Sequence, residues 1–76
     1  MNENVFGVIT FHSTSHAIQA ERVCRRQGIH VRLIPVPRHI SSDCGVCLRF
    51  ASDNMERVKT ILSEHKVEIS SAVSCL

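Results

Sequence analysis

Val5-Phe-Gly-Val-Ile-Thr-Phe11 is followed directly by His12-Ser-Thr-Ser15, and this junction decides the fold. In the first stretch, apolar residues occupy both alternating faces, which is typical of a strand in the middle of a sheet. In the second, Ser13, Thr14 and Ser15 supply side-chain oxygens that can cap the start of a helix. The sequence therefore predicts a central strand that leads straight into a helix.

The predicted first helix extends from about Thr14 to Gln27. Its apolar residues recur at helical spacing, and they are Ala17, Ala20, Val23 and Cys24. Gly28 is well placed to end the helix, because glycine readily adopts the left-handed backbone that commonly closes one. We expect Cys24 to be a core residue.

Two strands flank a polar loop that extends from Arg38 to Gly45. The stretch from Ile29 to Val36 alternates apolar and polar residues, which predicts a half-buried strand. Pro35 and Pro37 should end it, because neither can donate to a strand ladder. The next strand has Val46, Leu48 and Phe50 on one face and Cys47 and Arg49 on the other.

The last quarter of the chain predicts a helix and a weak strand. Asp53 with Glu56 three residues later resembles a capping box, with Asp in place of Ser or Thr. Apolar spacing from Met55 indicates a helix that ends near Lys66. Residues 67 to about 73 form the final strand of this interpretation.

The order β-α-β-β-α-β predicts an α+β fold, the ferredoxin-like split βαβ sandwich. It has a four-stranded antiparallel sheet with two helices on one face. Right-handed crossovers place the third strand between the first and second. We expect residues 1–76 to form a single domain. In this topology residues 12–16 and 38–45 lie at one end of the sheet, and Cys44 lies near the N-terminus of the first helix.

Composition narrows the class of protein. A net charge of +2 on 76 residues is too small to argue for nucleic acid. No apolar run approaches the ~20 residues of a membrane helix, and the start lacks the basic segment of a secretory signal. We therefore expect a cytoplasmic protein with reduced thiols, no nucleic-acid partner and no membrane partner.

Basic residues cluster in the first half of the chain. They are Arg22, Arg25, Arg26, Arg32 and Arg38. This cluster is interpreted as a solvated helix face plus a strand edge, and the alternative is a docking patch for an acidic partner.

Cys44 is presented in the polar loop, which is not the setting of a core residue. The thiolate is the reactive form of cysteine, and a helix N-terminus or nearby cations lower its pKa from about 8.5. Arg38, His39 and His12 are the candidate cations, whereas Asp43 acts against them. The pattern indicates a working thiol, and the alternative is an unreactive loop cysteine.

Residues around this thiol are candidates for holding an anion or a terminal sulfur. Ser41 and Ser42 supply hydroxyl and backbone donors, and Arg38 supplies charge. Gly45 permits a turn that side chains would obstruct and leaves the sulfur accessible. Ser13 and Thr14 at the start of the first helix complete the predicted binding set.

Cys44 and Cys47 form a C-x-x-C pair. In an extended chain their Cα atoms would be ~10 Å apart, beyond the ~7 Å limit for a disulfide, so bridging needs a turn at Gly45. Cys47 is otherwise a small strand residue on the face opposite Val46 and Leu48.

Zinc is a further alternative, with Cys44, Cys47, His39 and the pair His12 and His16 as ligands. No second C-x-x-C or H-x₃₋₅-H pair completes a known zinc-site spacing. We therefore expect the protein to bind no metal and no cofactor.

The chain resembles the putative selenium/sulfur carrier protein-like family, a small bacterial domain. The resemblance covers roughly residues 5 to 70. It is carried by Thr10-Phe-His-Ser-Thr-Ser-His-Ala17, by Leu33-Ile-Pro-Val-Pro-Arg-His-Ile-Ser-Ser-Asp-Cys44-Gly45 and by Leu48-Arg-Phe50. It implies that Cys44 is the carrier cysteine, that Ser41, Ser42 and Gly45 shape its loop, and that the turn at residues 11–16 abuts it. The family pattern does not require a cysteine at Cys47, which leaves open a resolving thiol particular to this chain.

The function expected from these observations is a sulfur or selenium carrier. Cys44 would hold a persulfide or selenopersulfide, loaded by a donor protein such as a cysteine desulfurase and passed to an acceptor protein. No general acid/base constellation is evident, so we expect a carrier and not an enzyme, with His39 and His12 as proton shuttles.

The alternative function is a small interaction or regulatory domain with a structural, redox-sensing or zinc-binding cysteine pair. Since the helices cover one face of the sheet only, Phe6 and Val8 could need cover, which favours a homodimer through the open face.

Overall fold

Strands and helices follow one another in the predicted order, in a computed structural model that describes residues 5–36 and 45–73. The elements are β1 (Phe6–Thr10), α1 (Thr14–Arg26), β2 (Arg32–Pro35), β3 (Val46–Ala51), a short 3-10 helix η1 (Ser52–Asn54), α2 (Met55–Glu64) and β4 (Ser71–Val73). The strands form one sheet in the order β2-β3-β1-β4, and each neighbouring pair is antiparallel. The ferredoxin-like α+β fold is confirmed, with β3 between β1 and β2.

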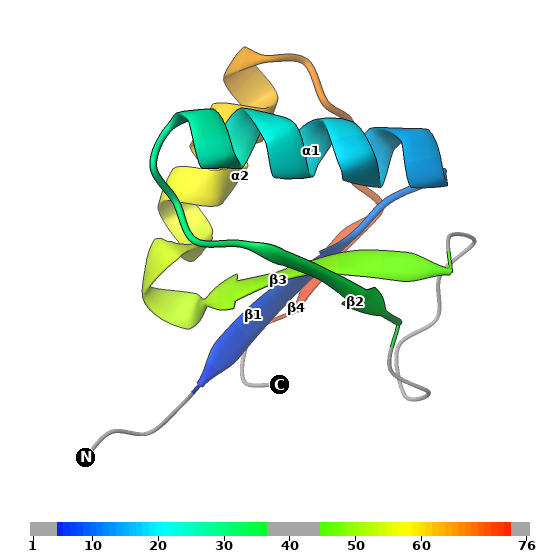
Figure 1. Cartoon of the computed structure of the whole chain (residues 1–76), viewed down its shortest axis with the longest axis horizontal. Helices are drawn as coiled ribbons and strands as arrows, with labels where there is room; N and C mark the ends of the chain where they lie inside the picture. The colour runs from blue at the N-terminus through cyan, green and yellow to red at the C-terminus, as the bar shows by residue number, and fades with distance from the viewer. Residues whose placement is uncertain (1–4, 37–44, 74–76) are drawn as a thin grey trace.

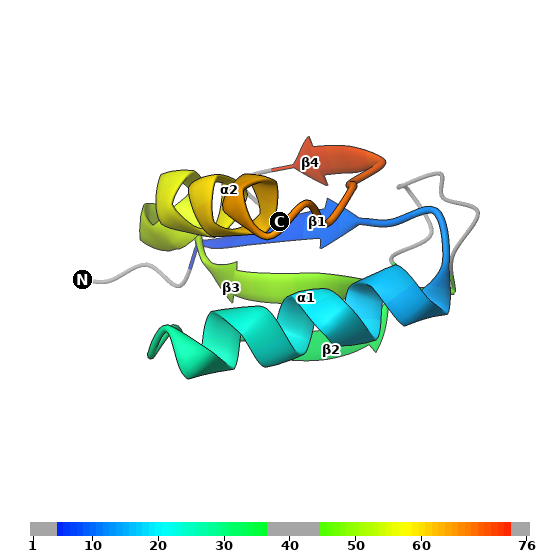
Figure 2. The same ribbon diagram turned by 90° about the horizontal axis from the view of Figure 1, so that it is seen from above.

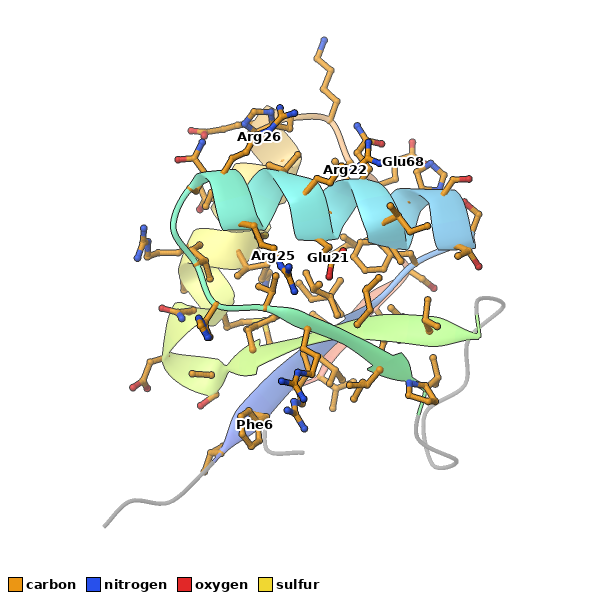
Figure 3. All side chains as sticks on the ribbon, viewed as in Figure 1. Phe6, Glu21, Arg22, Arg25, Arg26 and Glu68 are labelled. Carbon is orange, nitrogen blue, oxygen red and sulfur yellow. The ribbon has the colours of Figure 1, made fainter. Side chains whose placement is uncertain are left out.

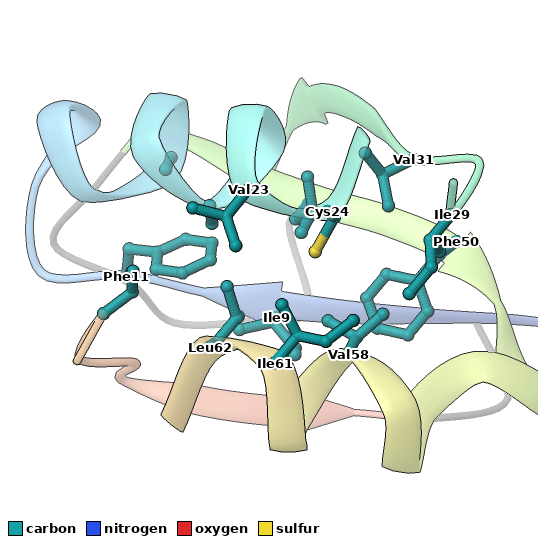
Figure 4. Close-up of a cluster of buried hydrophobic side chains, with 14 residues drawn as sticks. Ile9, Phe11, Val23, Cys24, Ile29, Val31, Phe50, Val58, Ile61 and Leu62 are labelled. Atoms are coloured by element: carbon teal, nitrogen blue, oxygen red, sulfur yellow. The ribbon is translucent and has the colours of Figure 1, made fainter. Parts of the chain in front are cut away.

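Both helices pack on one face of the sheet (Figures 1 and 2). The side chains between the two layers form a hydrophobic cluster (Figure 4). Its largest members include Ile9 and Phe11, Leu48 and Phe50 of β3, Val23 of α1, and Val58, Ile61 and Leu62 of α2. Burial of this apolar surface is the main force that holds the helices on the sheet. Neither helix in residues 5–36 and 45–73 has the length and apolar run that a membrane crossing requires.

Helix α1 begins and ends where its sequence indicates. Ser13 is the N-cap, and its Oγ accepts the backbone N–H of His16 at 3.4 Å. At the other end Gly28 has a φ of +81°. The N–H groups of Gly28 and Ile29 donate to carbonyls of the last helical turn, each at 3.0 Å. This Schellman motif satisfies carbonyls that the helix end would otherwise leave unpaired.

Helix α2 differs from the prediction at its start. The capping box of Asp53 and Glu56 is wrong, because Asp53 lies inside η1 and the N-cap residue Asn54 makes no side-chain cap hydrogen bond. Because the chain enters α2 through this 3-10 turn, Asn54 has φ −92° and ψ 3° and lacks the extended backbone that a capping serine adopts. The helix also ends at Glu64, short of Lys66.

Two strands are shorter than predicted. Strand β2 begins at Arg32, because the preceding residues connect the sheet edge to the end of α1, yet Ile29 and Val31 remain buried in the core. Strand β4 begins only at Ser71. Pro35 is the last residue of β2, as predicted, and a proline is tolerated there because β2 is an edge strand.

Candidate functional site

One end of the sheet gathers the start of α1 and the residues that bracket the predicted cysteine loop. The register places Cys47 opposite both Thr10 of β1 and Ile34 of β2. Two residues nearer the loop, the N–H of Val36 donates to the carbonyl of Gly45 at 3.2 Å. Figure 1 shows the first turn of α1 at this same end. The ends of β1 and β2 and the start of β3 therefore lie at the end of the sheet where α1 begins, whereas the predicted place of residues 38–44 lies outside the described residues.

The start of α1 is polar and carries no carboxylate. The Oγ of Ser13 lies 2.8 Å from Nδ1 of His16, so the cap also fixes this imidazole. No Asp or Glu occurs in the first turn of the helix, and therefore no side chain of that turn offsets the partial positive charge of the helix N-terminus. His12 and Thr14 are exposed beside it. This arrangement can stabilise an anion that comes to this end of the sheet.

Cys47 is the cysteine of this end that the structure describes. It lies on the face opposite Val46 and Leu48, as predicted, because those two belong to or pack against the core under the helices and Cys47 does not. Cys47 is 0% exposed even so. A resolving role for this thiol would therefore require local opening of the sheet face, and the role stays a prediction.

Gly45 is exposed, and it follows Cys44 directly in the sequence. Its backbone is not left-handed, and a Cβ placed on it would meet no atom of residues 5–36 and 45–73 within 4 Å. The turn that this glycine was predicted to permit lies outside the described residues, so that role stays a prediction.

Several predicted site residues lie outside the described residues. They are Arg38, His39, Ser41, Ser42 and Cys44, and their roles stay predictions. The zinc alternative depends on two of them. Within residues 5–36 and 45–73, no group of three or more His, Cys, Asp or Glu is placed to hold a metal ion.

Cys24 shows what a non-reactive thiol of this protein looks like. It is fully buried on the core face of α1, as predicted (Figure 4). Burial raises the pKa of this thiol from 9.0 to about 11. The thiolate is thus scarce at neutral pH, and Cys24 is a structural residue.

A basic hollow at the opposite end of the sheet was missed by the sequence interpretation. It has a volume of about 740 Å³ and lies between residues 28–32 and the end of β3. Its lining includes Arg25, His30, Arg32 and Arg49 but no Asp or Glu. The signal was present in the sequence, because Arg32 and Arg49 both point outward from strands that were expected to pair.

The face of the sheet away from the helices is less exposed to solvent than expected. Val8 is 0% exposed within this single chain, so the inference that it needs a partner is wrong. Phe6 is half-buried, and the guanidinium of Arg49 lies 4.5 Å from its ring centroid. A homodimer through this face stays a prediction, but the burial of Val8 means that this residue no longer supports it.

Comparison with known proteins gives one match. A family model described as putative Se/S carrier protein-like matches residues 6–74. No curated protein and no solved structure matches the chain. The resemblance found in the sequence is therefore confirmed over nearly its whole length.

Proposed function

We propose, on the premise that the chain belongs to the putative Se/S carrier protein-like family, that it carries sulfur or selenium on Cys44. The thiolate of Cys44 attacks the terminal sulfur of a persulfide on a donor protein. An S–S bond forms at Cys44 while the S–S bond of the donor breaks, and the donor leaves as a thiolate. An acceptor thiolate then attacks the same terminal atom and releases Cys44. Each step is an exchange without net oxidation, and selenium follows the same course.

One observation carries this proposal. The start of α1, with no carboxylate in its first turn, stands at the sheet end where Gly45 is placed, and Gly45 follows Cys44 in the chain. A helix N-terminus favours the thiolate over the thiol, and it also favours the anionic persulfide that the carrier holds between transfers. The burial of Cys24 and Cys47 makes both poor carriers by comparison.

The surrounding residues receive supporting roles in this proposal. Arg38, Ser41, Ser42 and Gly45 bind the charged terminal atom together with Ser13 and Thr14 at the start of α1. His12 and His39 move the proton when the thiol is engaged or released. The chain acts as a carrier in the cytoplasm and not as an enzyme. Its partners are a donor protein such as a cysteine desulfurase, and an acceptor protein.

Alkylation kinetics test the reactive thiol. The rate of modification by iodoacetamide is measured against pH in the wild type, Cys44→Ser and Cys75→Ser. We expect one fast phase at neutral pH, lost in Cys44→Ser and kept in Cys75→Ser, because a thiolate near a helix N-terminus persists at lower pH. If Cys44 reacts no faster than Cys75, the proposal is wrong. Protection of Cys44 together with bound zinc would favour the metal-binding alternative.

A further inference from the structure

Two of the arginines that line the hollow at the far end of the sheet are brought together by the pairing of β2 with β3. Arg32 of β2 and Arg49 of β3 are directly opposite each other in the antiparallel register. Their neighbours Leu33 and Leu48 face the helices, so both arginines project from the open face. Side chains directly opposite in such a pair have Cβ atoms about 5 Å apart, and like charges at that distance repel.

No carboxylate within residues 5–36 and 45–73 forms an ion pair with Arg32 or Arg49. An ion pair of this region joins Arg25 to Glu21, with Arg25 Nη2 and Glu21 Oε2 at 3.2 Å (Figure 3). Arg25 also donates to the carbonyl of Val31 at 3.4 Å, which directs it to the rim of the hollow. Glu21 thus partly offsets the charge of Arg25. The charges of Arg32 and Arg49 repel each other, and an anion from outside would relieve that repulsion by binding between them.

The arginine pair is preorganised to bind an oxyanion. The guanidinium of Arg49 is held over the ring of Phe6, which limits the rotamers that binding would have to freeze. Two guanidinium groups side by side can share one carboxylate, and each donates in the fork geometry that carboxylates accept. Binding would both form these hydrogen bonds and relieve the repulsion.

The surroundings of the pair fit a protein surface better than a small molecule or a nucleic acid. Among the other lining residues, Phe6 offers a half-buried ring, the apolar Ile29 and Phe50 are buried beneath the surface, and Asn54 is the lining amide. A small ligand would need more polar groups to orient it. A nucleic acid would need a longer basic track and several exposed aromatic rings, yet of the three phenylalanines Phe11 and Phe50 are buried.

We propose that the Arg32–Arg49 pair and its hollow bind an acidic segment of a partner protein, in which Asp or Glu lies next to an apolar side chain. The partner's part in sulfur or selenium transfer rests on the proposed function. The pair lies four residues along β3 from Gly45, about 13 Å. A partner docked there would sit at the other end of β3 from the place where the thiol is proposed to act, and it would leave that place uncovered.

A peptide-binding experiment tests this. Fluorescein-labelled hexaglutamate is titrated with full-length protein, and anisotropy is followed at low ionic strength and at about 0.5 M salt. We compare wild type, Arg32→Gln/Arg49→Gln, and the matched control Arg22→Gln/Arg57→Gln. The control removes the same charge from exposed helix positions outside the hollow. We expect the first pair to weaken binding by about tenfold and the control by less than about twofold, with binding lost at high salt.

Three results would overturn the inference: no binding to the wild type, equal weakening in the two double variants, or binding of inorganic pyrophosphate or octauridylate at the pair without binding of hexaglutamate. Thermal unfolding of Arg32→Gln/Arg49→Gln should show little change in stability, because the substitution removes a repulsion together with the favourable contact between Arg49 and the ring of Phe6. The same titration with Cys44→Ser should give the wild-type affinity. Failure of the carrier proposal would therefore leave this measurement intact, and failure here would leave the carrier proposal intact.

Discussion

The thiols of this protein are distinguished by burial. Cys24 and Cys47 are both 0% exposed, and they lie on opposite faces of the sheet layer. A carrier sulfur has to be reached first by a donor and then by an acceptor, so these two of the four cysteines are poor candidates in the folded state. The environment of each cysteine, more than the number of cysteines, decides which one can exchange sulfur.

Cys24 should give the protein a loss of stability in alkali. Its pKa is raised by burial from 9.0 to about 11, so the unfolded chain loses this proton first as the pH rises. Its contribution is complete below about pH 9, and the free energy of unfolding should fall between pH 9 and pH 11 and then level off, by at most about 3 kcal/mol in all. Urea unfolding at several pH values measures this. In Cys24→Ala the fall should be smaller by that amount, and an equal fall would contradict the assignment.

At the scale of elements, the two helices close with the same motif on different residues. Gly28 ends α1 with a φ of +81°, and Lys66 ends α2 with a φ of 59°. The N–H of Val67 donates to the carbonyl of Leu62 at 2.8 Å, as Ile29 does after α1. A side chain at a positive φ is strained, and glycine is not.

Lys66→Gly should therefore stabilise the protein, and Gly28→Ala should destabilise it. We expect changes of about +0.5 to +1 and about −1 kcal/mol in the free energy of unfolding, measured with urea. Gly45→Ala is the matched control with a change below about 0.5 kcal/mol, because its backbone is not left-handed and space for a Cβ is open. Destabilisation by Lys66→Gly would show that the Lys66 side chain matters more than its backbone.

The start of α1 can be altered without removing its cap. Ser13→Asp keeps a good N-cap residue but adds a carboxylate, whereas Ser13→Ala removes the cap at a cost of about 1 kcal/mol. If the helix start favours the thiolate of Cys44, Ser13→Asp should slow alkylation of Cys44 at neutral pH while stability is retained. Unchanged alkylation with a stable fold would mean that the start of α1 does not act on this thiol.

Prediction from sequence succeeded where one residue pattern had one structural solution. The alternation of Val46, Leu48 and Phe50 permits only one face of β3 to meet the helices, and Gly28 has a backbone preference that few residues share. It failed where packing decides between local options. Asp53 suits a cap by composition, but the chain enters α2 through η1. The burial of Val8 depends on how distant segments meet, which no local pattern contains. The arginine pair beside the hollow could have been found by aligning the two strands that were expected to pair.

At the scale of the molecule, the sheet separates two regions of different chemistry. One end holds the start of α1 and the residues that bracket the proposed carrier loop, and the other holds the Arg32–Arg49 pair. His12, Thr14 and Gly45 are exposed at the first end, and Arg32 is exposed at the other. With the proposed carrier site at one end and the proposed docking region at the other, a partner would be held while the sulfur stays accessible.

Loading by a donor protein tests the central claim most directly. The full-length protein is incubated with a cysteine desulfurase and cysteine, and peptides are then analysed by mass spectrometry for an added mass of about 32 Da, one sulfur. The account predicts this addition on Cys44, its loss in Cys44→Ser, and none on Cys24 or Cys47. An unloaded Cys44, or sulfur found equally on Cys75, would contradict the account.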